Sequence, residues 1–179
     1  MQSISIFSNI KLMMLYPGMI KYMIIPIIMG IICMIYLGYN AYVDIKFKEI
    51  PVNIALITSV VGVVLTFLAT IISGIMSVEM IFSVVKTLII SLIPGVVLYL
   101  VSKITNQIIG YGDAMVVGVI GLYLGAKNVV NIMLIAFFIA GLIALYEIVI
   151  MKKNKRYEMP FVPFLFVSYV FINLIKFLF

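Results

Sequence analysis

The sequence predicts an all-α membrane protein, a polytopic bundle of about six transmembrane helices. Three observations lead to this fold class. Of the 179 residues, 66% are hydrophobic and only 10% are charged, which is more apolar surface than a water-soluble domain needs. The mean hydropathy is correspondingly high, at +1.35. Several apolar stretches also reach or approach the roughly 20 residues that a helix needs to cross a bilayer.

The predicted spans follow one another with short connections. They cover residues 22–43, 52–73, 80–102, 113–131, 132–150 and 160–178. The fourth and fifth adjoin directly, and Gly125, Lys127 and Asn128 could instead form a turn that shortens the fourth span. Because no segment outside the spans is long enough to fold by itself, residues 21–179 are predicted to form one membrane domain.

Residues 1–20 precede the first predicted span. They have neither the basic start nor the small-residue cleavage site of a secretory signal peptide. The segment could form an interfacial helix that ends at the helix breakers Pro17 and Gly18. It could alternatively be sequence upstream of a later start at Met19 or Met23.

The basic residues indicate the orientation of the helices. They gather after the first, third and fifth predicted spans, at Lys46, Lys48, Lys103 and 152–156, whereas the loop 73–79 has none. By the positive-inside rule these basic loops face the cytoplasm and both termini face outside. The basic residues on the opposite side are Lys11, Lys21, Lys127 and Lys176. This topology, with contacts to lipid headgroups, accounts for the net charge of +6 without a nucleic-acid partner.

The chain lacks the side chains of several catalytic classes. It contains no histidine and one cysteine, Cys33, in the middle of the first predicted span. This composition excludes a disulfide framework within the chain, a Cys-based metal site, a zinc site with His ligands and a His-dependent nucleophilic triad. We therefore expect neither a metal ion nor a cofactor.

Two aspartates lie at the ends of predicted spans. Asp44 follows the first span in NAYVDIKFKEIPVN, and Asp113 opens the fourth in GYGDAMVVG. The predicted topology places both on the cytoplasmic side, so they can be neighbours. Two close carboxyls at the edge of a low-dielectric region share a proton. Aspartic proteases use such a pair, because the ionised member takes a proton from water while the protonated member polarises the scissile carbonyl.

Small residues surround Asp113. Gly110 and Gly112 allow backbone conformations closed to other residues, and they leave room for a substrate strand to approach. The small residues that follow, at spacings of 4, 3 and 4, are Ala114, Gly118, Gly121 and Gly125. This spacing places them on one helical face, where a neighbouring helix can pack closely.

Other interpretations of the charged residues remain open. Asp113 could be an N-cap, and Asp44 could mark the end of a span. Lys86 and Glu147, inside spans, could pair or extend toward the membrane surface. The aspartates could also relay protons in a small transporter, although the chain shows no internal repeat. A third alternative is an inactive assembly protein of the same fold.

Three separated segments match one known family. They are YVDIKFKEIPVN at 42–53, GYGDA at 110–114 and MPFVPFLF at 159–166. They resemble the first aspartate motif, the G-x-G-D motif and the Pro-Phe-x-Pro-Phe start of the last helix in the type IV prepilin leader peptidases. These are membrane aspartic proteases that include the archaeal preflagellin peptidases. The motif residues besides the aspartates are Pro51, Asn53, Gly110, Gly112, Pro160, Phe161 and Pro163.

The resemblance implies that Asp44 and Asp113 are the catalytic pair, and it leaves their individual roles open. It implies a cell-membrane endopeptidase that removes, at the cytoplasmic face, the short basic leader of a pilin-like or preflagellin-like precursor. Pro160 and Pro163 would shape a re-entrant or kinked start of the last helix beside the aspartates, or simply begin that helix.

Two features depart from the family pattern. Bacterial members often have a basic residue two positions after the G-x-G-D aspartate, where this chain has Met115, so that Lys103 could supply the charge instead. Larger members also N-methylate the new terminus and carry an insertion with paired cysteines. With a single cysteine and no such insertion, this chain is expected to have peptidase activity alone.

Overall fold

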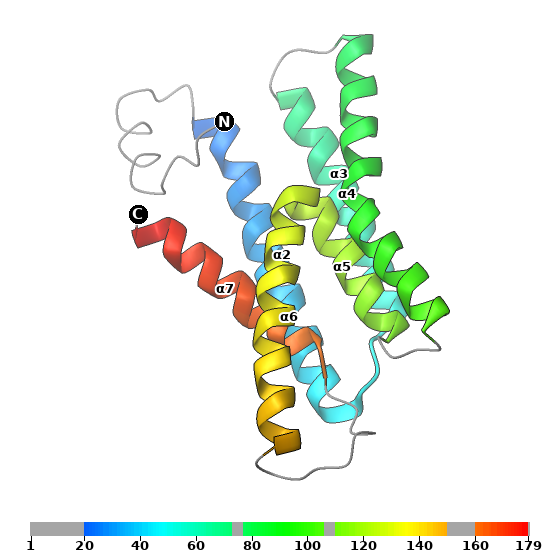
Figure 1. Cartoon of the computed structure of the whole chain (residues 1–179). Helices are drawn as coiled ribbons and strands as arrows, with labels where there is room; N and C mark the ends of the chain where they lie inside the picture. Colours follow the sequence, from blue (N-terminus) through cyan, green and yellow to red (C-terminus); the bar gives the residue numbers. More distant parts are fainter. Residues whose placement is uncertain (1–19, 73–76, 106–109, 150–159, 179) are drawn as a thin grey trace.

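The computed structural model describes residues 20–72, 77–105, 110–149 and 160–178. These residues form an all-helical bundle without a strand (Figure 1), so the predicted fold class is confirmed. The helices are α2 (Ile20–Phe47), α3 (Val52–Ile72), α4 (Val78–Ile104), α5 (Tyr111–Leu124), α6 (Ala126–Val149) and α7 (Val162–Leu178). Residues 1–19 and the basic cluster 152–156 lie outside the described residues, so the predictions for them stay predictions.

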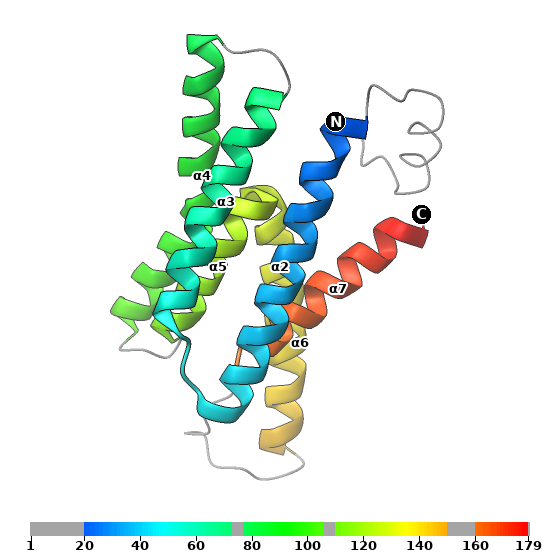
Figure 2. The same ribbon diagram turned by 180° about the vertical axis from the view of Figure 1, so that it is seen from behind.

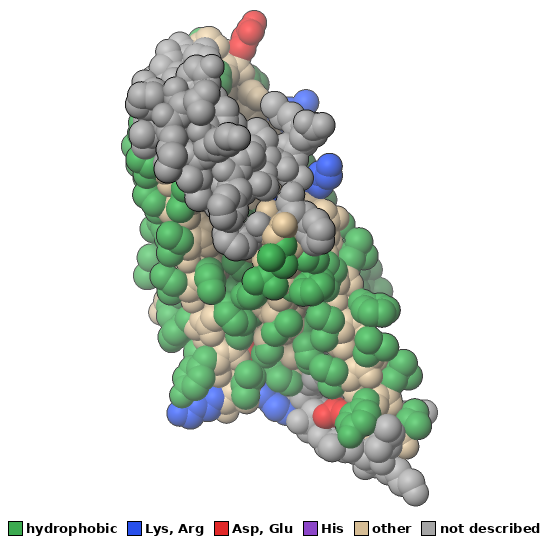
Figure 3. Space-filling model, turned by 90° about the vertical axis from the view of Figure 1, so that its left-hand side faces the viewer, with side chains coloured by type: hydrophobic (Ala, Val, Ile, Leu, Met, Phe, Trp, Pro, Cys, Tyr) green, Lys and Arg blue, Asp and Glu red, His purple; other side chains and the backbone are tan. Residues whose placement is uncertain are grey.

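Four of the six helices, α2, α3, α4 and α6, are long and apolar enough to cross a membrane. The other two are shorter, with 14 residues in α5 and 17 in α7. At 1.5 Å per residue they are about 21 and 26 Å long, less than the roughly 30 Å of a hydrocarbon core. Exposed apolar side chains cover the flank of the bundle, while charged side chains lie toward its ends (Figure 3). The chain is therefore a membrane protein in which two helices are shorter than a full span.

The boundary between the fourth and fifth predicted spans was wrong by several residues. Helix α5 ends at Leu124 rather than at 131, because Gly125 has a φ of +78°, which a residue with a Cβ rarely adopts. The Gly125 N–H donates to the Gly121 carbonyl at 2.8 Å, and the Gly125 carbonyl accepts from Val129 at 3.2 Å. The alternative of a turn that shortens the fourth span is thus confirmed at Gly125, whereas Lys127 and Asn128 lie in the first turn of α6.

Helix α5 occupies the centre of the bundle. It contacts α2, α3, α4 and α6, and it lies between the α3–α4 pair and the group formed by α2, α6 and α7 (Figures 1 and 2). The side chains of Val116, Val117 and Ile120 are fully buried. A helix that is apolar on all sides is expected in such a buried position. Because protein rather than lipid surrounds α5, this helix can be shorter than a full span.

Small residues bring α4 and α5 into backbone contact. A Cβ added to Gly95 would lie 2.6 Å from the Cα of Gly118, and a Cβ added to Gly121 would overlap the carbonyl oxygen of Ser91. The small-residue face predicted for α5 is thus confirmed at Gly118 and Gly121. It stops before Gly125, where an added Cβ would meet nothing within 4 Å, so Gly125 serves the turn.

Candidate active site

Asp44 lies in the last turn of α2, three residues before the end of that helix. Lys48 follows the helix with a φ of 53°, and its N–H donates to the Asp44 carbonyl at 3.0 Å. Pro51 then directly precedes α3, as expected of a residue that cannot continue a helix but can stand before a new one. The sequence thus ends one helix and begins the next within a few residues, and the Asp44 side chain stays buried.

The Asp44 carboxyl is bonded to the start of α7. The Val162 N–H donates to Asp44 Oδ2 at 3.1 Å, and the Phe161 N–H also donates to this carboxyl. Phe161 is the residue before the helix, and its carbonyl accepts from Phe164 at 3.0 Å and from Leu165 at 3.3 Å. Because the Phe161 side chain has no acceptor, the first N–H groups of α7 would lack a capping partner. Asp44 supplies that partner from another helix.

Asp113 is the third residue of α5. The residue that precedes the helix is Gly110, which makes no side-chain cap bond, so the interpretation of Asp113 as the N-cap was wrong. The Asp113 carboxyl accepts a hydrogen bond from the Gly110 N–H, and the Asp113 N–H donates to the Gly110 carbonyl at 3.1 Å. This is the local arrangement by which an acid in the first turn stabilises a helix start.

The two aspartates lie within electrostatic range of each other. The charge of Asp44 acts repulsively on Asp113, while the ammonium of Lys48 acts attractively on Asp44. The last turn of α2 and the first turns of α5 and α7 therefore meet at one end of the bundle (Figure 1). Both predicted catalytic carboxyls are together in space; their catalytic role stays a prediction.

Gly112 is explained by its contact with Ile50. A Cβ at position 112 would lie 2.8 Å from Ile50 Cδ1 and 2.9 Å from Ile50 Cβ. Gly110 has an ordinary φ of −63°, and among the described glycines only Gly125 has a positive φ. The prediction that Gly110 and Gly112 adopt special backbone conformations was therefore wrong. The space beside Gly112 is occupied by Ile50, which belongs to the link that follows Asp44.

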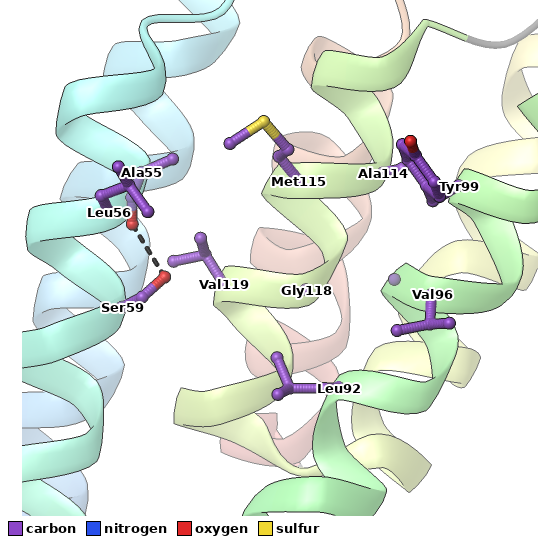
Figure 4. A pocket seen from close by; sticks show the side chains of 11 residues that line it. Ala55, Leu56, Ser59, Leu92, Val96, Tyr99, Ala114, Met115, Gly118 and Val119 are labelled. Atoms are coloured by element: carbon purple, nitrogen blue, oxygen red, sulfur yellow. Dashed lines mark hydrogen bonds between the residues drawn. The ribbon is translucent and has the colours of Figure 1, made fainter.

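A cavity of about 270 Å³ lies between α3, α4 and α5 (Figure 4), and its lining includes Ala114 and Met115, the two residues that follow Asp113 in the sequence. Met115 points into it from α5 toward the side chains of Ala55 and Leu56 on α3. The lining is almost entirely apolar, and its Ser59 hydroxyl already donates to the Ala55 carbonyl at 2.8 Å. The position where the family often has a basic residue thus faces an apolar cavity, while Lys103 is exposed in the last turn of α4.

The remaining predicted motif residues lie at the same end of the bundle as the two aspartates. Asn53 is exposed in the first turn of α3, and the Pro51 carbonyl accepts from Ala55 at 3.2 Å. Pro160 and Pro163 flank the start of α7, and the Phe161 ring stacks on Phe137 of α6, with centroids 4.8 Å apart. Of these, Phe161 has the most direct link to the aspartates, through its backbone N–H.

Sequence reasoning missed Val162 and Ile50, because one acts through its backbone and the other through its shape. It also missed a polar line on α2, in which Tyr36, Asn40 and Asp44 follow at a spacing of four, a helical pattern that could have revealed it. The Asn40 amide donates to the Tyr36 carbonyl at 2.8 Å. The Tyr36 hydroxyl and Asn40 Oδ1 are buried without a hydrogen-bond partner among the described residues.

Comparison with known proteins gives one match. The sequence model of the type IV leader peptidase family matches residues 28–145, more than half of the chain, including both aspartates. No curated protein and no solved structure gave a significant match.

Proposed function

The chain belongs to the type IV leader peptidase family, and on this basis we propose that it is an aspartic endopeptidase in which Asp44 and Asp113 activate water. Membership of this family makes it a protease. The proposed substrates are prepilin-like or preflagellin-like precursors. They are cut at the cytoplasmic face of the cell membrane, between a short basic leader and the hydrophobic segment that follows it.

The observation that carries the proposal is the pair of carboxyls at one end of the bundle. Two carboxyls that repel each other in a partly desolvated site share one proton. The ionised member takes a proton from water, whose oxygen then bonds to the carbonyl carbon, while the protonated member gives its proton to the carbonyl oxygen. When the tetrahedral intermediate collapses, the former carbonyl oxygen returns its proton to the aspartate that gave it, the C–N bond breaks, and the leaving amine takes the proton that came from water. These reaction steps need no metal ion or cofactor.

The apolar lining of the cavity between α3, α4 and α5 favours a substrate with an apolar segment. It begins at Ala114 and Met115, immediately after Asp113, and its lining offers few polar groups. We assign to it the first apolar side chains of the hydrophobic segment of the precursor. The peptide bond before that segment would then reach the aspartates.

The basic residues support the proposed orientation. Lys46 and Lys48 lie beside Asp44 at the end of α2, and Lys103 lies in the last turn of α4. These two helix ends lie on the same side of the bundle as the first turn of α5. By the positive-inside rule, this end faces the cytoplasm.

Co-expression with tagged precursors tests the proposal. Wild type is expected to shorten at least one pilin-like precursor of a panel, whereas Asp44→Asn and Asp113→Asn leave it uncut. Glu79→Gln serves as the matched control, because Glu79 is an exposed acid in the first turn of α4. All variants are compared at equal amounts in the membrane. If wild type cuts none of the precursors, or if either Asn variant cuts as well as wild type, the proposal is wrong.

The same variants address the transporter alternative. A carrier would show proton-dependent uptake that both Asn variants abolish, without cleavage of any precursor. The position of the aspartates at helix ends, on one side of the bundle, favours the peptidase, because carriers typically bind near the middle of the membrane.

A further inference from the structure

We propose that the start of α7 holds Asp44 as a carboxylate, so that Asp44 is the general base of the pair and Asp113 is the proton donor. This assignment rests on the proposed peptidase function. It goes further by giving each aspartate one role and by making the Phe161–Val162 backbone a positioning element.

The first step is the nature of the groups that contact Asp44. The Val162 N–H donates at 3.1 Å, and the Phe161 N–H donates as well. A backbone N–H can only donate, and two donors directed at one carboxyl favour its charged form. The N-terminus of a helix also carries a partial positive charge of about half a unit, which favours an anion at this position.

The second step is the sequence at the start of α7. Pro163 has no N–H, so the donors at this helix end are concentrated at Phe161 and Val162. The Val162 side chain is fully buried, and the Phe161 ring is stacked on Phe137 of α6. Both donors are therefore fixed by packing. The function of this proline-flanked segment, in our proposal, is to present two N–H groups to Asp44.

The third step is the contrast with Asp113. Its carboxyl accepts from one backbone N–H, that of Gly110 in its own turn. Among the described residues, the charge that acts on Asp113 is the repulsive charge of Asp44, whereas Lys48 attracts Asp44. Within the described part of the chain, no charged side chain of α7 acts on either carboxyl. Of the two aspartates, Asp44 is thus the better supported as an anion.

An amide-to-ester replacement at Val162 tests the assignment most directly. Introducing α-hydroxyvaline at this position by nonsense suppression removes the N–H and keeps the side chain. An ester at Phe164 is the matched control, because it removes an N–H of the same helical turn that bonds the Phe161 carbonyl rather than Asp44. The pH dependence of kcat/KM is measured on a cleaved precursor in detergent.

The Val162 ester is expected to move the acidic limb of the profile to higher pH by about one unit or more, because the base is more easily protonated without the donor. The Phe164 ester should leave this limb at the wild-type position. If the acidic limb stays in place in the Val162 ester, or if only the basic limb moves, the assignment of roles is wrong.

Val162→Pro and Val162→Ala give a second test with ordinary residues. Proline is tolerated at the first helical position and removes the same N–H, so it should move the acidic limb as the ester does. Alanine keeps the N–H and should leave the limb in place even if packing losses lower the rate. An unchanged profile in a cleaving proline variant overturns the inference while the peptidase function stands. Absence of cleavage by wild type overturns the peptidase function itself.

Discussion

Val162 donates its backbone N–H to Asp44 Oδ2 at 3.1 Å, across 118 residues of sequence. This bond joins the last turn of α2 to the first turn of α7. Helix α7 lies beyond the segment that matches the family model, which ends at residue 145, yet it contacts one of the two aspartates of the candidate site. The start of α7 therefore belongs to this site.

Gly112→Ala should impair cleavage because it moves the G-x-G-D segment at the start of α5 away from the segment that follows Asp44. The new Cβ would lie 2.8 and 2.9 Å from Ile50 Cδ1 and Cβ, so the first turn of α5 must move away from the link after Asp44. We expect kcat/KM to fall by at least tenfold, since small displacements of catalytic groups cost about this much or more.

Shortening Ile50 provides the matched rescue. Ile50→Gly removes both atoms that the new methyl would meet, Cδ1 at 2.8 Å and Cβ at 2.9 Å, so the Gly112→Ala/Ile50→Gly double variant should recover activity relative to Gly112→Ala. A double variant whose kcat/KM is no better than that of Gly112→Ala would show that the Ile50 contact is not the reason for glycine at 112. Precursor cleavage at equal enzyme amounts in the membrane is the measurement.

Gly121→Ala should lower stability, whereas Gly141→Ala should not. A Cβ at 121 would overlap the Ser91 backbone carbonyl, which cannot rotate away, whereas a Cβ at 141 in α6 would meet nothing within 4 Å. Overpacking of this kind costs about 1–3 kcal/mol, and alanine in an open helical position contributes about 0.5–1 kcal/mol of stability. Thermal unfolding in detergent should therefore shift in opposite directions. A Gly121→Ala protein as stable as wild type would contradict the close contact of α4 with α5.

Tyr123→Phe should destabilise the contact of α5 with α3. The buried Tyr123 hydroxyl donates to the Thr58 carbonyl at 2.7 Å, and losing such a bond typically costs about 1 kcal/mol in the free energy of unfolding. Tyr146→Phe on α6 is the control, because Tyr146 is 51% exposed and its replacement should leave stability unchanged. Equal unfolding transitions for the two variants would argue against this hydrogen bond.

Met115→Lys should weaken substrate binding more than the chemical step. Its ammonium would enter the apolar cavity to which the hydrophobic segment of the precursor is assigned, and an unpaired charge there is costly. We expect KM to rise about tenfold, equivalent to about 1.4 kcal/mol, with a smaller change in kcat. Met115→Leu keeps the size and apolar character and should bind as wild type does. A KM unaffected by lysine would mean that substrate does not use this cavity.

Much of the fold was predictable because its signals are local. The apolar composition and the lengths of the apolar runs predict a helical membrane bundle. The break at Gly125, where φ is positive, was only one of two alternatives that the sequence left open. The spacing of Gly118 and Gly121 predicts a closely packed face, since residues three and four apart share one side of a helix. The largest local error was the end of the fourth helix, which was predicted at residue 131 and lies at Leu124.

The site was only partly predictable, because its contacts join residues far apart in sequence. The two aspartates could be identified because a carboxylate is energetically costly in an apolar chain and because both lie in motifs that resemble a known family. No sequence pattern, however, shows which helix each carboxyl contacts. The N–H groups of Phe161 and Val162 carry no side-chain signal, since every residue except proline has one. Ile50 acts only by filling the space that Gly112 leaves.

By itself, then, the sequence determined the fold class, the packed face of α5 at Gly118 and Gly121, and the two candidate carboxyls, because local composition and periodicity specify these features. Tertiary structure decided that Asp44 caps α7, that Gly112 faces Ile50 and that Met115 faces an apolar cavity. Each of these depends on the distance between two helices and on which turns of the two helices are in contact. That geometry arises from the packing of the whole bundle rather than from any one segment.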